Sequence, residues 1–337
     1  MPVVQKQESM ASRSAPSPRK NAAASAPRNP NVDRWLERFL AQQPPRAKSL
    51  VVTIFGDAIV PHGGQIWLSG LIDLLAPFGI DHRLTRTSVF RLTREGWLES
   101  RRAGRRSLYA LTASGRRRFE HAYRRVYTLP GQSWDGTWTV VVLPRAGNGA
   151  ELRTELRKDL EWEGFGMVAP GVFAHPSADP ATLSDILRGL ALERKVFVMT
   201  AREHDALRAR PLRDLVQQCW DLEQLARDYR RFVKRFEPVG AYFSERPAPS
   251  PEQAFLVRML LIHTFRRAIL HDPQFPAELL PPDWPGRVAY ELCRDLYRLT
   301  CEQAERYLTE RLEGPDGPLP PASPAFFERF GGLPPLR

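Results

Sequence analysis

The sequence of 337 residues contains only three cysteines, and they lie at Cys219, Cys293 and Cys301 with no CxxC pair. This pattern is neither the framework of a disulfide-rich secreted protein nor the ligand spacing of a zinc finger. The chain also lacks a run of about 18 uncharged apolar residues, so we expect no transmembrane helix. Its basic N-terminus lacks the apolar segment of a secretory signal. These absences predict a cytoplasmic protein that does not associate with a membrane.

Signatures of common enzymes are missing as well. The sequence has no GxSxG, P-loop or GxGxxG segment, and its seven histidines are scattered. No compact group of His, Asp and Glu residues has metal-ligand spacing. The sequence therefore predicts no catalytic residue, no bound metal and no cofactor.

Positive charge is present, but it is unevenly distributed. Although the whole chain carries +11, residues 81–125 alone hold 13 Lys and Arg against 4 Asp and Glu, a net +9. Residues 126–337, with 27 basic and 29 acidic residues, carry −2. An excess of basic residues confined to one segment is typical of a protein that binds a polyphosphate backbone.

The order of patterns along the chain predicts an α+β protein of several domains. Residues 1–30 are rich in Ala, Ser, Pro, Lys and Arg, so we expect a disordered basic extension over residues 1–46. Residues 47–128 predict a winged helix-turn-helix, residues 129–208 a ferredoxin-like βαββαβ domain, and residues 209–337 an α-helical domain.

The winged-helix prediction depends on helical spacing followed by hairpin signals. Residues 48–60 are apolar enough for a buried first helix, and residues 65–68 predict a short strand. Apolar residues recur at helical intervals in residues 70–79 and 83–95, which predict two further helices. An Ala-Gly pair at residues 103–104 then separates two strand-like segments. Three helices, a short strand and a hairpin make up a winged helix-turn-helix.

The two later domains have different patterns. Residues 137–143 are a β-branched run suited to a buried strand, and the elements after it follow the order β-α-β-β-α-β of a ferredoxin-like module. From Pro211 onward the pattern is helical. Residues 212–236, 251–272 and 286–312 each predict one long amphipathic helix.

The third helix and the hairpin are the candidates for binding double-stranded DNA. A major groove admits one helix, and an arginine can donate two hydrogen bonds to guanine. The helix residues that we expect at bases or phosphates are Arg83, Thr85, Arg86, Thr87, Ser88, Arg91 and Arg94. The hairpin residues that we expect at phosphates are Arg101, Arg102, Arg105 and Arg106. The alternative interpretation is a solvated helix face.

Seven segments carry a recognisable pattern: GGQIWLSGLIDLLAPFGI, RTSVFRLTREGWL, GRRSLYALTASGRRR, WDGTWTVVVLP, EWEGFGMVAPGVFAHP, LLIHTFRRAILHDPQFPAELLPPDWPG and FFERFGGL. Together, and in this order from residue 47 to residue 333, they resemble the PaaX family of bacterial repressors of phenylacetic acid degradation. The resemblance implies a winged-helix DNA-binding domain, a central domain with the fold of a small Cas-type nuclease and a helical C-terminal domain. It also implies a homodimer on palindromic operators that phenylacetyl-coenzyme A releases.

A coenzyme A thioester needs basic side chains beside an apolar pocket with aromatic walls. The segment HTFRRAILHD offers adjacent arginines beside apolar residues, and tryptophans lie in neighbouring elements. The effector candidates are Arg266, Arg267, Trp162, Trp220 and His263. The competing interpretation of the two arginines is a solvated helix face or an ion pair with Asp272, and that of the histidine is a core position.

Two other functions are alternatives to that of a repressor. Nucleases with the central fold hold a divalent metal through an acidic residue at the end of the first strand, as the resemblance implies. Leu143 and Pro144 occupy that place here, and Asp135 precedes the strand, which disfavours a metal-dependent nuclease. A PaaX-like regulator with another acyl-coenzyme A or aromatic inducer stays open, because ligand identity depends on the shape of the pocket.

Overall fold

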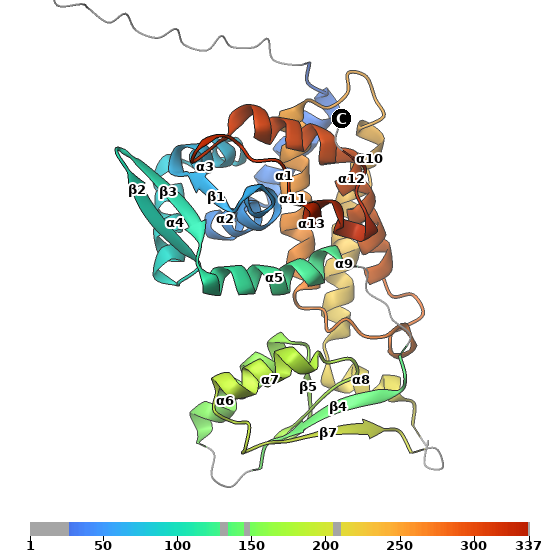
Figure 1. The fold of residues 1–337 in the computed structure, drawn as a ribbon. Helices are drawn as coiled ribbons and strands as arrows, with labels where there is room; N and C mark the ends of the chain where they lie inside the picture. The colour runs from blue at the N-terminus through green and yellow to red at the C-terminus, as the bar shows by residue number, and fades with distance from the viewer. Residues whose placement is uncertain (1–26, 129–133, 145–148, 205–209, 336–337) are drawn as a thin grey trace, which may run out of the picture.

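The computed structural model describes residues 27–128, 134–144, 149–204 and 210–335. The chain has two lobes (Figure 1). The larger lobe holds the N-terminal helices, a hairpin and the long C-terminal helices, and the smaller lobe is built around a sheet. The protein is thus an α+β molecule of several domains. None of the helices in the described ranges is long and apolar enough to span a membrane.

The N-terminal part of the larger lobe packs helices around a small antiparallel sheet with the strand order β1-β3-β2. In chain order its elements are α1 (Pro30–Gln42), α2 (Ala47–Ile54), β1 (Gln65–Trp67), α3 (Leu68–Leu75), α4 (His82–Arg94), β2 (Leu98–Ala103), β3 (Arg106–Leu111) and α5 (Ala113–Tyr127). After α2 the helix continues as a π turn over Phe55–Ile59 and a 3-10 turn over Val60–His62.

The prediction of disorder over residues 1–46 is wrong for α1. Asn29 caps this helix through its side chain, and Pro30 occupies the first helical position. One face of α1 is buried and consists of Val32, Trp35, Leu36 and Phe39. The Phe39 ring lies 5.7 Å from that of Phe236, so apolar packing against the C-terminal helices offsets the entropic cost of ordering this segment. Residues 1–26 lie outside the described residues.

The smaller lobe contains one four-stranded sheet with two helices on one face (Figure 1). Its elements are β4 (Thr137–Val142), α6 (Ala150–Trp162), β5 (Gly166–Ala169), β6 (Val172–His175), α7 (Pro180–Gly189) and β7 (Phe197–Arg202). The strand order is β5-β6-β4-β7, and each neighbouring pair is antiparallel. Leu156, Leu160, Leu183 and Leu187 bury the inner faces of α6 and α7 against the sheet.

The C-terminal part consists mainly of helices, with one short hairpin. Its elements are α8 (Leu212–Cys219), α9 (Leu222–Phe236), α10 (Val239–Tyr242), α11 (Pro251–Ile269), α12 (Gly286–Arg311), β8 (Glu313–Gly314), β9 (Gly317–Pro318) and α13 (Pro324–Phe327).

The single helix predicted over residues 212–236 is two helices in the structure. Asp221 starts the second one, because its carboxylate accepts a hydrogen bond from Gln224 N. Trp220 leaves the helical path and packs against the smaller lobe. A Cβ on Gly166 would lie 2.4 Å from the Trp220 ring, so this contact requires a glycine. The break in the helix therefore joins the two lobes.

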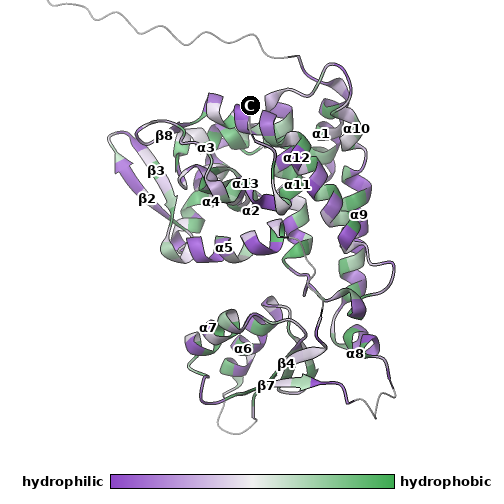
Figure 2. Cartoon of the chain, turned by 45° about the vertical axis from the view of Figure 1, so that its right-hand side comes forward, coloured by the Kyte–Doolittle hydropathy of each residue, from purple (hydrophilic) through white to green (hydrophobic). Residues whose placement is uncertain are grey.

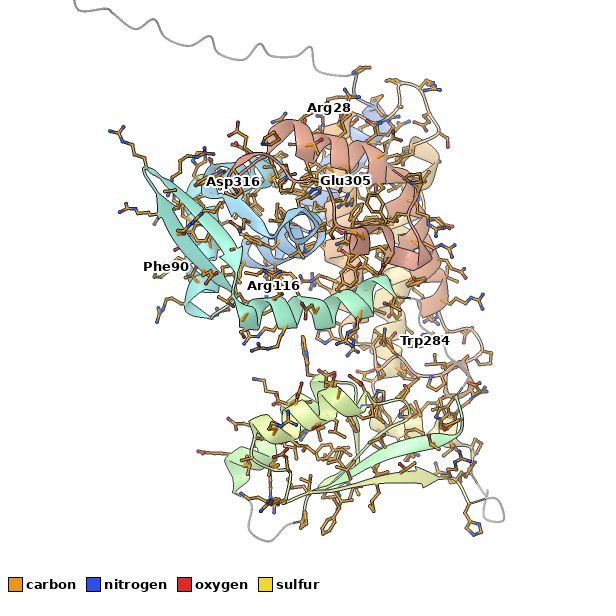
Figure 3. All side chains as sticks on the ribbon, in the orientation of Figure 1. Arg28, Phe90, Arg116, Trp284, Glu305 and Asp316 are labelled. Atoms are coloured by element: carbon orange, nitrogen blue, oxygen red, sulfur yellow. The ribbon has the colours of Figure 1, made fainter. Side chains whose placement is uncertain are left out.

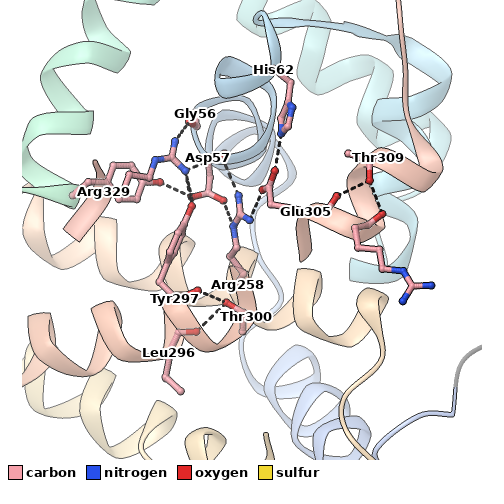
Figure 4. A network of polar contacts seen from close by, with 12 residues as sticks. Gly56, Asp57, His62, Arg258, Leu296, Tyr297, Thr300, Glu305, Thr309 and Arg329 are labelled. Atoms are coloured by element: carbon pink, nitrogen blue, oxygen red, sulfur yellow. Dashed lines mark hydrogen bonds and ion pairs between the residues drawn. The ribbon is translucent and has the colours of Figure 1, made fainter. Parts of the chain in front are cut away.

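One hydrophobic core runs through both ends of the chain, because α2 packs along α11. Figure 4 shows a buried network that crosses the same boundary. Asp57 of the π turn accepts hydrogen bonds from Arg258 on α11 and from Arg329 in the C-terminal tail. Arg258 also donates to Glu305 on α12. The segments predicted as separate domains at residues 47–128 and 209–337 therefore share one core.

Candidate nucleic-acid interface

The helix α4 lies at the surface of the larger lobe, next to the β2–β3 hairpin (Figure 1). Gly79, with a φ of +76°, turns the chain between α3 and α4. The Asp81 carboxylate then accepts a hydrogen bond from Leu84 N at 2.7 Å and starts the helix. Val89 and Leu92 anchor α4 in the core. The opposite face is left to solvent.

The exposed face of α4 carries most of the helix residues that the sequence predicted. The exposed members of that set are Arg83, Arg86, Thr87, Arg91 and Arg94. Their spacing of three and four residues places them along one broad stripe. Four guanidinium groups on the exposed side of one helix form a surface suited to phosphates and to the acceptor edges of guanine.

The prediction that Thr85 and Ser88 contact DNA is wrong, because both side chains are buried. Thr85 is one helical turn before Val89 and so shares its inward face. The Thr85 hydroxyl donates to Asp81 O at 2.9 Å within the helix. Both side chains are covered by the rest of the protein, so neither is placed to contact a nucleic acid.

Phe90 is a surface residue that the sequence reasoning missed. Its ring is 61% exposed although the side chain is large and apolar. Figure 3 places it at the outer edge of the larger lobe. The sequence position of Phe90 already indicated that it is exposed. Phe90 lies seven residues after Arg83 and four after Arg86, so the three side chains lie on the same stripe of the helix.

The hairpin is a second basic element beside α4. Ala103 pairs with Arg106, so Gly104 and Arg105 form the two-residue turn, one position later than the predicted Ala-Gly turn. Gly104 has a φ of +60°, as such a turn requires. The four hairpin arginines, Arg101, Arg102, Arg105 and Arg106, are all exposed. The hydropathy colours mark the strand β2 of this hairpin as hydrophilic (Figure 2).

Arg106 differs from the other hairpin arginines, because its guanidinium already has contacts within the protein. It lies over the Trp67 ring, with Cζ 4.1 Å from the ring centroid. Its Nη2 lies 3.8 Å from Glu313 Oε2 on β8. Arg106 therefore holds the hairpin against β1 and β8, and less of its charge is free for a ligand.

The helix α5 extends the basic surface and fixes its geometry. Thr112 caps α5 and donates its hydroxyl hydrogen to Gly96 O at 2.5 Å, at the junction of α4 and β2. A Cβ on Gly115 would lie 2.2 Å from Trp97 O, so the first turn of α5 sits directly on that junction. Three exposed arginines follow, namely Arg116, Arg117 and Arg118. The helix α4, the hairpin and the start of α5 are thus one connected unit.

The five effector candidates do not come together in one cavity of the described structure. Arg266 lines a cavity under α5, whereas Trp220 lines a cleft at α8 and α9. Trp162 and Arg267 are exposed, and neither lines either of these two cavities.

His263 is a core residue rather than a ligand-binding one. Its ring is buried, and its Nδ1 lies 3.1 Å from Thr53 Oγ1. Burial, together with the charges of Arg266 and Arg267, lowers the pKa of His263 to about 3, so the ring is neutral near pH 7.

The described residues of the smaller lobe show no grouping suited to a metal. Asp135 uses its Oδ1 to accept hydrogen bonds from Thr137 N and from the Thr137 hydroxyl. Within the described ranges, no three His, Cys, Asp or Glu side chains lie close enough together to hold a metal ion.

Comparison with known proteins assigns the chain to a family. Residues 46–115 match a family described as PaaX-like protein, residues 131–213 the PaaX protein central Cas2-like domain, and residues 220–310 the PaaX-like protein C-terminal domain. The transcriptional repressor PaaX of Escherichia coli is 35% identical over 303 residues, which cover 90% of this chain and 95% of that protein. The chain belongs to the PaaX family.

This result confirms the resemblance seen in the sequence, including a central domain like a small Cas protein. The relative in the PaaX family is a transcriptional repressor, so the chain is a regulator and not an enzyme. A solved structure of an uncharacterized protein from Mycobacterium tuberculosis is 27% identical and covers 70% of this chain and 90% of its own, with a TM-score of 0.43.

Proposed function

We propose that this PaaX family member is a bacterial transcriptional repressor that acts in the cytoplasm on genes for phenylacetate degradation. It binds double-stranded operator DNA as a homodimer, and phenylacetyl-coenzyme A releases it. The observation that carries the proposal is the arginine stripe on α4 beside an arginine-rich hairpin. The kinship with the Escherichia coli repressor supports the regulatory role.

The DNA-binding element that we propose is a winged helix-turn-helix. In this arrangement α3 and α4 are the two helices of the motif, α4 enters the major groove, and the β2–β3 hairpin is the wing. Arg83, Arg86, Arg91 and Arg94 then face bases and phosphates, and Arg101, Arg102 and Arg105 face phosphates. The strand order β5-β6-β4-β7 supports a ferredoxin-like interpretation of the central domain.

Release by an effector requires two states of the protein with unequal affinity for it. The shared core of the N-terminal and C-terminal parts supports such coupling, because a shift of one helix in this core is passed on to α4 and the hairpin. In a homodimer, the spacing of the two α4 helices must match half-sites about 10 base pairs apart or a multiple of that distance.

A gel-shift experiment tests the proposal. The purified protein is mixed with promoter DNA of the phenylacetate operon and then titrated with a panel of acyl-coenzyme A esters. We expect a complex that survives excess unrelated DNA and that phenylacetyl-coenzyme A dissolves. Equal binding to unrelated DNA would refute operator recognition. Release by another ester, with phenylacetyl-coenzyme A inactive, would favour a PaaX-like regulator with a different inducer.

A matched pair of variants tests the interface itself. Arg86→Glu reverses a charge on the exposed stripe of α4, and Arg287→Glu reverses one on the exposed start of α12. We expect the first variant to lose the gel shift and the second to keep it, with both proteins folded. Equal loss in the two variants would mean that overall charge, rather than α4, determines binding.

A further inference from the structure

A cavity of about 210 Å³ lies under α5, between that helix and the elements on which it packs. Its walls come from α2, the π turn, the inner face of α5, α11 and the C-terminal tail. Most of the lining is apolar, including Val52, Phe119, Val126 and Ile262. The buried network around Asp57 and Arg329 forms part of the same lining (Figure 4).

Arg266 is a buried cation in this lining, and no carboxylate of the described residues forms an ion pair with it. Its side chain is largely buried, and its Nε has no hydrogen-bond partner in the part of the chain that the structure describes. Burial lowers the pKa of Arg266, an effect that Tyr127 opposes and the charge of Arg267 increases. Because an uncompensated cation is costly in an apolar environment, this site favours a ligand oxygen with negative charge or a strong dipole.

The size of the cavity limits the ligand. An apolar protein cavity of about 150 Å³ is large enough for benzene. The cavity under α5 therefore accommodates a ring-sized apolar group with a short acyl arm. A coenzyme A moiety is far too large and has to remain outside. Arg116 lines the cavity and is also exposed on α5, so it lies where a ligand would leave the protein (Figure 3).

The position of the cavity links it to the basic surface. Phe119, Tyr123 and Val126 on the inner face of α5 line it, and the start of α5 sits on the junction of α4 and the hairpin. A ligand that pushes α5 away from α2 would therefore change how α4 and the hairpin lie relative to the rest of the lobe. Such a ligand would bind one arrangement better than the other, as release requires.

We propose that this cavity is the effector site, and that it binds the apolar aryl-acyl group of a carboxylic acid or its thioester with the carbonyl oxygen at Arg266. This inference rests on the proposed function, which supplies the effector but not its site. The free acid and the thioester share the group that the cavity recognises, and only the thioester has a second part that extends past Arg116.

Direct binding without DNA tests the site independently of the repressor function. Isothermal titration calorimetry on the full chain uses phenylacetate, phenylacetyl-coenzyme A and coenzyme A alone as probes. We expect one of the first two to bind and coenzyme A alone to bind at least about tenfold more weakly. Equal binding of coenzyme A alone would overturn the site, and so would absence of binding by all three probes.

Two neighbouring arginines provide a matched comparison. Arg266→Met removes the cation from the cavity but keeps the volume, whereas Arg267→Met removes an exposed charge one residue away. We expect at least about tenfold weaker ligand binding in the first variant and less than about twofold in the second. Equal binding in the two variants would overturn the site.

The melting temperature without ligand adds a second readout. Because the charge of Arg266 has no opposite partner among the described residues, Arg266→Met is expected to melt no lower than the wild-type protein, which separates loss of a ligand contact from loss of folding.

Ala122→Phe, on the cavity side of α5, places a ring in the cavity and is expected to abolish ligand binding. Undiminished binding by Ala122→Phe would also overturn the site. Ligand binding that depends on Arg266 but leaves the operator complex intact would refute the proposed function and leave the site standing.

Discussion

The guanidinium of Arg106 stacks on the Trp67 ring, with 4.1 Å between Arg106 Cζ and the ring centroid. Arg105, the next residue towards the hairpin tip, is exposed in the two-residue turn. Two adjacent arginines therefore have different roles. Arg106 fixes the hairpin to β1, and Arg105 is free to contact phosphate.

Alanine substitutions at these two positions are expected to separate the roles. Arg105→Ala should lower affinity for all DNA sequences alike and reduce the slope of log K against log salt by about 0.9, the value for one phosphate contact. Arg106→Ala should change the slope less and lower the free energy of unfolding by about 0.5–1 kcal/mol, the worth of an exposed cation–π pair. Fluorescence anisotropy at several salt concentrations and urea unfolding measure the two effects. The assignment fails if Arg106→Ala has the larger effect on the slope.

Phe90 is expected to contribute sequence specificity rather than general affinity. An exposed phenyl ring within the arginine stripe is suited to contact a thymine methyl group in the major groove. Phe90→Ala should weaken operator binding about tenfold, the cost of one mismatched base pair, and leave binding to unrelated DNA unchanged. Its melting temperature should not change, because the ring is already exposed.

Replacing thymines of the promoter fragment by uracil provides the control for Phe90. Uracil lacks the methyl group, so at the contacted position it should weaken the wild-type protein as much as Phe90→Ala does. The two changes should not add, because each removes the same contact. Full additivity at every thymine would show that Phe90 does not touch a methyl group.

Asp57 is expected to be essential for the stability of the larger lobe. Its carboxylate lies 2.7 Å from Arg258 Nε and 3.3 Å from Arg329 Nη1, and all three side chains are buried. Asp57→Ala leaves two buried guanidinium groups with less compensation, which should lower the free energy of unfolding by about 3–5 kcal/mol. Asp135→Ala breaks an exposed pair with Arg202, and this change should lower the free energy of unfolding far less. Similar values in urea unfolding would contradict the role of the network.

The elements that the sequence predicted correctly are those with local signals. The helix α4 and the hairpin follow from capping, helical spacing and turn residues within residues 81–111. Local signals for α1 were also present, in Asn29, Pro30 and the spacing of its apolar residues. The composition of the first thirty residues indicated disorder instead.

The features that sequence reasoning missed depend on contacts between distant residues. Asp57 and Arg258 are separated by 201 residues, and nothing near either one indicates its partner. The roles of the adjacent arginines Arg266 and Arg267 likewise depend on which of them turns towards α5. The face to which Thr85 belongs was readable from Val89, four residues later. The helical pattern therefore indicates a buried side chain at residue 85, although a hydroxyl group is able to bond phosphates.

His175 is expected to make the protein less stable in mild acid. Its Nε2 lies 3.0 Å from Pro273 O, and its Nδ1 accepts a hydrogen bond from Ser177 N. A proton added to Nδ1 of His175 would therefore point at the backbone N–H of Ser177. Burial lowers the pKa of His175 to about 4, although the Pro273 carbonyl opposes the shift.

The sign of the effect follows from the protons that each state binds. Between pH 6.5 and 4 the unfolded chain protonates this histidine and the folded protein does not, so stability is lost as the pH falls through this window. From pH 7 to 5 the loss attributable to His175 is about 2 kcal/mol. His175→Gln cannot titrate, so its free energy of unfolding should fall by that much less over the same range in urea unfolding. A variant as acid-sensitive as the wild-type protein would show that His175 is not held neutral at the contact between the two lobes.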